Sequence, residues 1–235
     1  MARREARKFP GVKVAPQPLV DYSVSDAPGT EISYFGYEFE VPWNGISRQK
    51  AGNGIVQLEF ESGQSVTFIV PTNQSGLLTE LVQDPSMHME NWRPVFGDLM
   101  NRSAYDQQAA LLYTTPQSVR AFGPRAEAVR GMTLLTIKAI ATPSSLGTGV
   151  FSFELPDKRG FQIGDPHKST RVDLEVFGMG GHHVEIICAT LKDNIKLSQS
   201  ELKRMLTSLH PVLAEPSAVP SPSITDRQKS VSGPH

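Results

Sequence analysis

Hydrophobic and polar positions alternate along residues 171–191, RVDLEVFGMGGHHVEIICATL. A period of two residues is typical of half-buried strands, so this segment is predicted to form a hairpin around a glycine turn. Its apolar faces coincide only if the loop has three residues, 179–181. That register places Val176 opposite Val184 and Glu175 opposite Glu185, and it makes the glycines a turn requirement.

The second strand of this hairpin is apolar on both faces over Ile186–Leu191. Such a strand usually lies inside a sheet, with layers above and below it, so we expect helices on both sides. A helix follows directly, because Ser198 and Glu201 form a capping box and an apolar stripe continues to Leu209.

The rest of the chain predicts further strands and helices around a polar loop at residues 44–53. The pattern of residues 132–141 suits a helix or a strand, and periodicity alone does not choose between them. The expected strands are Tyr34–Val41, a hairpin in Ile55–Val70, Val150–Leu155 and Phe161–Ile163. The expected helices are Leu77–Val82, one capped by Ser103 and Asp106, a short one at Thr115-Pro116, and Pro124–Ala141.

These elements predict an α+β domain with a largely antiparallel sheet and helices packed on it. Residues 1–30 are interpreted as a Pro-rich, basic, extended leader and residues 31–212 as the single domain. Residues 213–235 are rich in Ser and Pro and are expected to be disordered.

Several stretches carry a resemblance to known proteins: SYFGYEFEVPW, RGFQIGDPHK, RVDLEVF, VEIICATL and LKRMLTSLHP. Together they resemble the PsbP-like α/β/α sandwich and uncharacterised bacterial proteins of that outline, over about residues 30–212. The resemblance implies a fold, a binding or assembly role and an envelope setting; it supplies no catalytic residue. Those bacterial proteins often carry an upstream membrane helix, which this chain is expected to lack.

Charge, cysteine count and the length of apolar runs argue against several classes of protein. The net charge of −1 over 235 residues gives no electrostatic reason to expect nucleic-acid binding. The single cysteine, Cys188, excludes an internal disulfide and is interpreted as a small core residue. No apolar run is long enough for a membrane span or a signal peptide, which favours a cytoplasmic location and leaves envelope association as the alternative.

The basic amino terminus is the one segment that suggests membrane contact. Arg3, Arg4, Arg7 and Lys8 would suit peripheral binding to an anionic surface, and a solvated tail is the competing interpretation.

The sharpest candidate site is the uneven face of the hairpin. The register brings Glu175, His183 and Glu185 together, a set that could bind a divalent cation or share a proton. The competing interpretation is a solvated sheet end. Met87-His88-Met89 offers soft ligands for copper, although methionines near a tryptophan more often serve packing.

A second candidate is an aromatic and basic patch made by Trp43, Trp92, Arg93 and Phe161, which could bind a protein partner. The competing interpretation is that each tryptophan fills the end of a sheet. No nucleotide, protease or hydrolase motif is present, and no cofactor is expected. We therefore expect a non-enzymatic binding or assembly module for a protein partner, with a small-molecule or metal-dependent enzyme using Glu175, His183 and Glu185 as the alternative.

Overall fold

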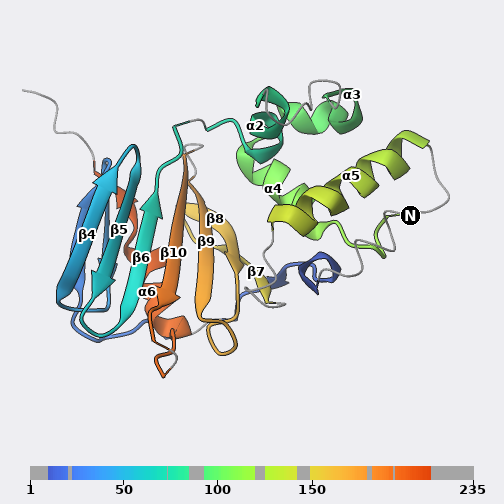
Figure 1. Cartoon of the computed structure of the whole chain (residues 1–235). Coiled ribbons are helices and arrows are strands. Elements are labelled where there is room, and N and C mark those ends of the chain that lie inside the picture. The colour runs from blue at the N-terminus through green and yellow to red at the C-terminus, as the bar shows by residue number, and fades with distance from the viewer. Residues whose placement is uncertain are drawn as a thin grey trace, which may run out of the picture.

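The computed structural model describes residues 10–20, 23–72, 74–84, 93–119, 125–141, 149–178, 182–192 and 194–212. Within them lies a mostly antiparallel main sheet in the order β1-β7-β8-β9-β10-β6-β5-β4, and a small sheet in the order β11-β3-β2 (Figure 1). The strands of the main sheet are β1 Gln17–Pro18, β4 Ile46–Gly52, β5 Ile55–Phe60, β6 Gln64–Ile69, β7 Val150–Glu154, β8 Lys158–Ile163, β9 Arg171–Gly178 and β10 His183–Thr190. Those of the small sheet are β2 Thr30–Tyr34, β3 Tyr37–Val41 and β11 His210–Pro211. The expected α+β class is confirmed; a PsbP-like α/β/α sandwich stays a prediction.

The organising hairpin has the predicted register. Val176 pairs with Val184 and Glu175 with Glu185 across β9 and β10. The Gly178 amide donates to the His182 carbonyl at 2.8 Å, which closes a loop of three residues. The loop itself, residues 179–181, lies outside the described residues. Matching the apolar faces was sufficient here because a slip of one residue would turn every buried side chain to the other face.

One face of the main sheet is covered by α6 (Gln199–Ser208) and the small sheet. The predicted capping box is present: Ser198 and Glu201 satisfy each other's backbone amides at the start of α6. Leu202 and Met205 are fully buried against the sheet. This layer, together with the inward side chains of β5, β6, β9 and β10, forms the larger hydrophobic core.

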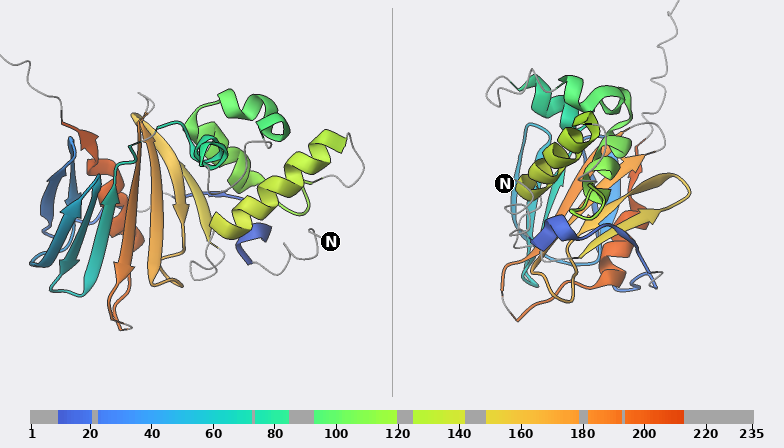
Figure 2. Two further views of the ribbon diagram at one scale, coloured as in Figure 1. Left: turned by 45° about the horizontal axis from the view of Figure 1, so that its top comes forward. Right: turned by 90° about the vertical axis from the view of Figure 1, so that its right-hand side faces the viewer.

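Helices on the opposite face cover only one end of the sheet (Figures 1 and 2). They are α2 Leu77–Gln83, α3 Arg93–Phe96, α4 Ala104–Tyr113 and α5 Arg125–Ala141, with a 3-10 turn, η4, at Gly97–Asn101. Residues 132–141, for which the sequence allowed a helix or a strand, are helical. Ser103 caps α4 as predicted, accepting from the Asp106 amide at 3.2 Å. The predicted helix at Thr115-Pro116 is wrong, because Thr115 and Ser118 bond to each other in a turn.

Part of the expected leader packs on this helical end. Residues Pro10–Lys13 form a 3-10 turn, η1, which places Val12 in a fully buried position, and β1 pairs in parallel with β7. The Lys138 ammonium of α5 donates to the carbonyls of Val14 (2.7 Å), Leu112 (2.5 Å) and Thr114 (2.9 Å). One buried charge thus joins the amino-terminal segment, the end of α4 and α5.

The polar loop expected at residues 44–53 is wrong over most of its length. It forms β4, the edge strand of the main sheet, and every residue of this strand is exposed. A solvated edge strand has no buried face, so it lacks the alternating pattern on which the sequence argument depended.

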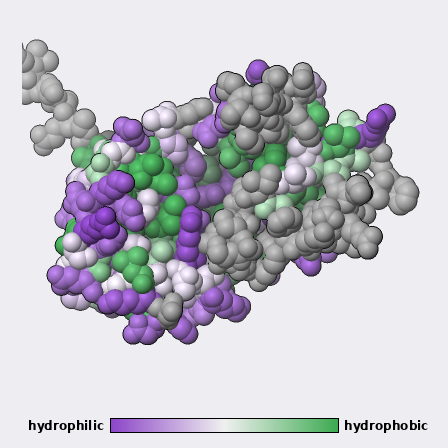
Figure 3. Space-filling model, in the orientation of Figure 1, coloured by the Kyte–Doolittle hydropathy of each residue, from purple (hydrophilic) through white to green (hydrophobic). Residues whose placement is uncertain are grey.

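The expectation of helices on both sides of β10 holds at one end of the strand only. Ile187 and Ala189 are half-buried, and Leu191, just beyond the strand, is 50% exposed. Ile69 on β6 and Ile55 on β5 continue the same face, where Ile55 is 44% exposed. We call Ile55, Ile69 and Ile187 the apolar strip. No helix in the described part of the chain packs over it, and Figure 3 shows hydrophobic surface bordered by hydrophilic side chains on this face.

Two predicted segments lie outside the described residues. They are the basic amino terminus with Arg3, Arg4, Arg7 and Lys8, and the tail at residues 213–235. In the described helices there is none with the length and apolar character needed to cross a membrane.

Candidate functional site

A cavity of about 190 Å³ lies where the helical end meets β9 and β10. Strands, helices and the β6–α2 connection all contribute to its wall. The lining residues are Pro71, Gly76, Leu77, Glu80, Ala104, Gln108, Glu175, Phe177, His183 and Glu185. The structure therefore brings the three predicted residues Glu175, His183 and Glu185 into one cavity, which we call the carboxylate pocket.

The two strand carboxylates of the pocket are directly paired across β9 and β10. Burial, with a further contribution from the nearby Glu185 charge, raises the pKa of Glu175 to about 8 despite a hydrogen bond with Gln108. Burial and the Asp173 charge also raise the pKa of Glu185, while Arg171 lowers it. Glu175 is therefore largely protonated at neutral pH, mainly because its surroundings disfavour the charged form and, to a smaller extent, because the paired Glu185 carries a like charge.

His183 adds a neutral imidazole to the pocket. Its ring stacks on Phe177 with centroids 4.4 Å apart and planes within 3°. Burial lowers the pKa of His183 to about 4, so the ring carries no charge at neutral pH.

Two polar side-chain atoms in the pocket have no hydrogen-bond partner. Oε2 of Glu175 and Nε2 of His183 each expose less than 1 Å². Buried polar atoms are nearly always paired, so two unpaired ones in the same cavity indicate where a ligand would bind.

The walls of the pocket are fixed by glutamines that the sequence analysis did not single out. Gln74, in the β6–α2 connection, accepts from the His183 amide at 2.5 Å and donates to the His183 carbonyl at 3.3 Å. Fully buried Gln107 of α4 donates to the Ser75 carbonyl at 3.1 Å and to the Thr79 hydroxyl at 3.1 Å. The connection to the helical end is thus bonded to the first residue of β10 and cannot shift without breaking these part-buried hydrogen bonds.

The pocket does not have the arrangement of a metal centre. In the part of the chain that the structure describes, no group of three or more His, Cys, Asp and Glu side chains could hold a metal ion. The metal site predicted at Glu175, His183 and Glu185 is thus not supported, although the proximity of the three residues was predicted. The copper site considered at residues 87–89 lies outside the described residues.

The predicted aromatic patch is wrong for two of its four members. Trp43 is 4% exposed, packs edge-on against Phe60 and donates its indole N–H to Glu201 at 3.1 Å. Phe161 is fully buried beneath α4. Both rings belong to the core because they lie on inward-facing strand or strand-end positions. Arg93 is exposed, and Trp92 lies outside the described residues.

Cys188 is a core residue, as interpreted from the sequence. It is fully buried with its sulfur 3.9 Å from that of Met205, and burial raises the pKa of its thiol far above the usual range.

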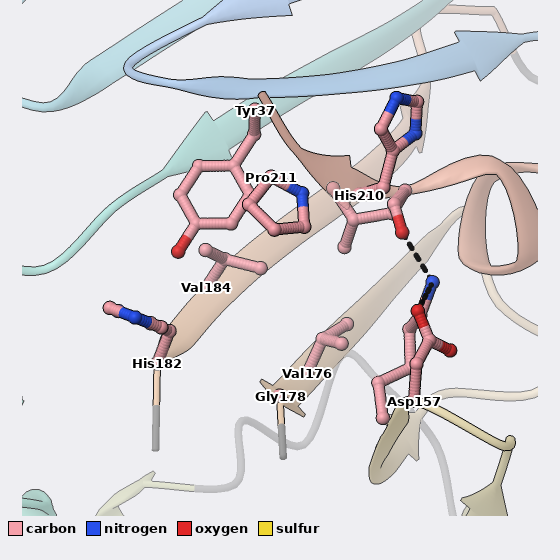
Figure 4. A pocket seen from close by; sticks show the side chains of 10 residues that line it. Tyr37, Asp157, Val176, Gly178, His182, Val184, His210 and Pro211 are labelled. Carbon is pink, nitrogen blue, oxygen red and sulfur yellow. Dashed lines mark hydrogen bonds and ion pairs between the residues drawn. The ribbon is translucent and has the colours of Figure 1, made fainter. Parts of the chain in front are cut away.

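A second cavity, of about 360 Å³, lies on the other face of the sheet between β9, β10 and β11. Its wall is mostly apolar, with Tyr37, Val176, Val184 and Pro211 around it (Figure 4). The Lys158 ammonium in its wall donates to the carbonyls of Leu206 (3.2 Å) and Leu209 and pairs with Asp157 at 3.1 Å. Because that polar group is satisfied, this cavity lacks the unpaired atoms that mark the carboxylate pocket.

Comparison with known proteins gives no relative from which a role could be transferred: the sequence matches no protein-family model and no curated protein. The site must therefore be interpreted from its own geometry.

Proposed function

We propose that this domain is a non-enzymatic binding module that holds a protein partner at the carboxylate pocket. The observation that carries the proposal is the pair of unpartnered buried polar atoms, Glu175 Oε2 and His183 Nε2, on residues that line one cavity. Polar atoms that are unpaired in the free protein favour binding, because the complex gains the hydrogen bonds that the free protein lacks.

The apolar strip favours a protein partner over a free small molecule. Ile69 is paired directly with Glu185, and Ile187 is two residues further along β10. Polar recognition inside a pocket is therefore continuous with half-exposed apolar surface beside it. This combination of a polar anchor and flanking hydrophobic surface is common in protein interfaces.

The composition of the pocket favours binding over catalysis. Of the described residues that line it, none is Ser, Thr, Cys, Tyr or Lys, so it offers no common nucleophile other than a carboxylate. Its volume of about 190 Å³ is also below the roughly 300 Å³ at which small-molecule sites begin.

An acid–base enzyme using Glu175, His183 and Glu185 is the second candidate. One observation favours it: a carboxylic acid whose pKa is about 8 is protonated at neutral pH and could act as a general acid. An enzyme of this kind would lose turnover in Glu175→Gln, whereas a binding module would show none to lose.

The test is quantitative affinity capture from the native cell, including its membrane fraction, with mass spectrometry. The baits are the full chain, the double variant Glu185→Gln/Ile187→Lys, and Glu31→Gln as control, since Glu31 is an exposed carboxylate on the small sheet. We expect a partner retained by the full chain and by the control and reduced at least tenfold with the double variant. If no captured protein depends on the pocket, the proposal is wrong. Inclusion of the membrane fraction also tests the envelope setting that the resemblance implies.

A further inference from the structure

We infer that the carboxylate pocket takes the cationic head group of a lysine or arginine side chain presented by the partner. This inference rests on the proposed function and specifies its chemistry. It follows from the acceptors in the pocket, from the absence of a cation there, and from the apolar part of the wall.

The pocket presents acceptors to a ligand that has only donors. The Glu185 and Glu80 carboxyls line the cavity beside the unpaired atoms Glu175 Oε2 and His183 Nε2. Glu175 becomes a pure acceptor once a bound cation ionises it, and Nε2 accepts when the ring proton is on Nδ1. Ammonium and guanidinium groups carry several N–H donors and no acceptor, so they match this set.

No cation of the described chain already fills this role. The lining includes no Lys or Arg side chain. Arg171, whose charge acts on Glu185, donates two hydrogen bonds of 2.7 and 2.8 Å to Asp173. Arg171 acts on Glu185 only from outside the lining, where it lowers the pKa of that carboxyl, so the cavity itself contains no cation.

The apolar part of the wall selects an amphipathic cation over an inorganic one. Pro71, Leu77 and Phe177 line the same cavity as the carboxylates. Lysine and arginine side chains bury their methylene stems along apolar surface while the head group finds polar partners. A bare metal ion would gain nothing from these contacts, which agrees with the missing metal geometry.

Binding of a cation should release a proton. Glu175 is protonated at neutral pH in the free protein, and a cation beside it favours the ionised form. The other ionisable groups around it are Glu185 and His183 on β10, Asp173 with its partner Arg171 on β9, and Glu80 on α2. The affinity should therefore rise with pH, by up to about tenfold per unit, and level off above pH 8.

The probes are terminally blocked arginine and lysine, with blocked citrulline as the uncharged isostere of arginine and methylammonium as the cation without a stem. They are titrated into the full chain while amide chemical shifts are followed by NMR at pH 6, 7 and 8. We expect saturable shifts around Glu175 and His183 for blocked arginine or lysine and none for citrulline. Glu185→Gln should weaken binding at least tenfold, and Glu31→Gln should leave it unchanged.

Three results would overturn the inference: equal binding of citrulline, equal binding of methylammonium, or an affinity independent of pH. Failure here is distinguishable from failure of the proposed function. If capture of a partner depends on the pocket but no blocked cation binds, the cation inference fails and the binding function stands. If no partner depends on the pocket, the binding function itself fails.

Discussion

Replacing Glu175 with glutamine should remove a loss of stability that the native protein suffers between pH 6.5 and 8. The pKa of this carboxyl rises from an ordinary 4.5 to about 8 on folding. Between these values the folded state holds a proton that the unfolded chain has released, so stability falls as pH rises. A glutamine side chain has the shape of the protonated acid and does not titrate, so the part of the fall that Glu175 causes should disappear.

The size of the effect depends on where His183 titrates. The pKa of His183 falls from 6.5 to about 4 on folding, so it adds stability as pH rises through that interval and opposes Glu175 there. Above pH 6.5 the histidine contribution is complete, and the remaining 1.5 units of the Glu175 interval correspond to about 2 kcal/mol, at about 1.36 kcal/mol per unit. Lys138, whose pKa falls to about 8, contributes only above this window.

The assay is urea unfolding at half-unit steps from pH 5 to 8, followed by circular dichroism. From pH 6.5 to 8 the full chain should lose about 2 kcal/mol more unfolding free energy than Glu175→Gln, and any fall that remains in the variant belongs to Glu185, whose pKa is also raised. Below pH 6.5 the variant should gain stability with pH more steeply than the full chain, because the histidine contribution is no longer opposed. Glu31→Gln is the control for loss of an exposed carboxylate. Parallel curves for Glu175→Gln and the full chain would refute the burial of this group.

Three further changes test the scaffold of the site. Lys138→Met leaves three backbone carbonyls without their donor and should cost about 2–4 kcal/mol in urea unfolding, against less than about 0.5 kcal/mol for Lys50→Met on exposed β4; equal effects would contradict the joining role of Lys138. Gly160→Ala would drive a methyl carbon into the backbone oxygen of Glu175 on β9, so it should abolish soluble expression. Gly52→Ala, with no atom within 4 Å, should be tolerated, and a stable Gly160→Ala protein would show that β8 and β9 pack less closely. Ser198→Ala removes one half of the α6 capping box and should lower the thermal midpoint by an amount equivalent to about 1 kcal/mol, and an unchanged midpoint would contradict that role.

Sequence alone determined those features that depend on neighbours in the chain. The register of β9 with β10 follows from a period of two on each side of a short turn, and the start of α6 follows from Ser198 and Glu201, three residues apart. The opposition of Glu175 to Glu185, and with it the acidic half of the site, was therefore predictable. Local spacing and face matching contain this information completely.

Tertiary structure alone decided how the site is closed and what it can bind. Glu80 and Gln108 reach the pocket from helices that are separated by tens of residues from β9, and Gln74 fixes His183 across 109 positions of sequence. Trp43 is of a residue type that is common in binding surfaces, but it is buried because α6 packs over it. The desolvation that keeps Glu175 protonated and His183 neutral depends on how these distant segments pack, and no local sequence pattern contains that information. The sequence therefore determined which groups meet on the strands, and packing determined their charge.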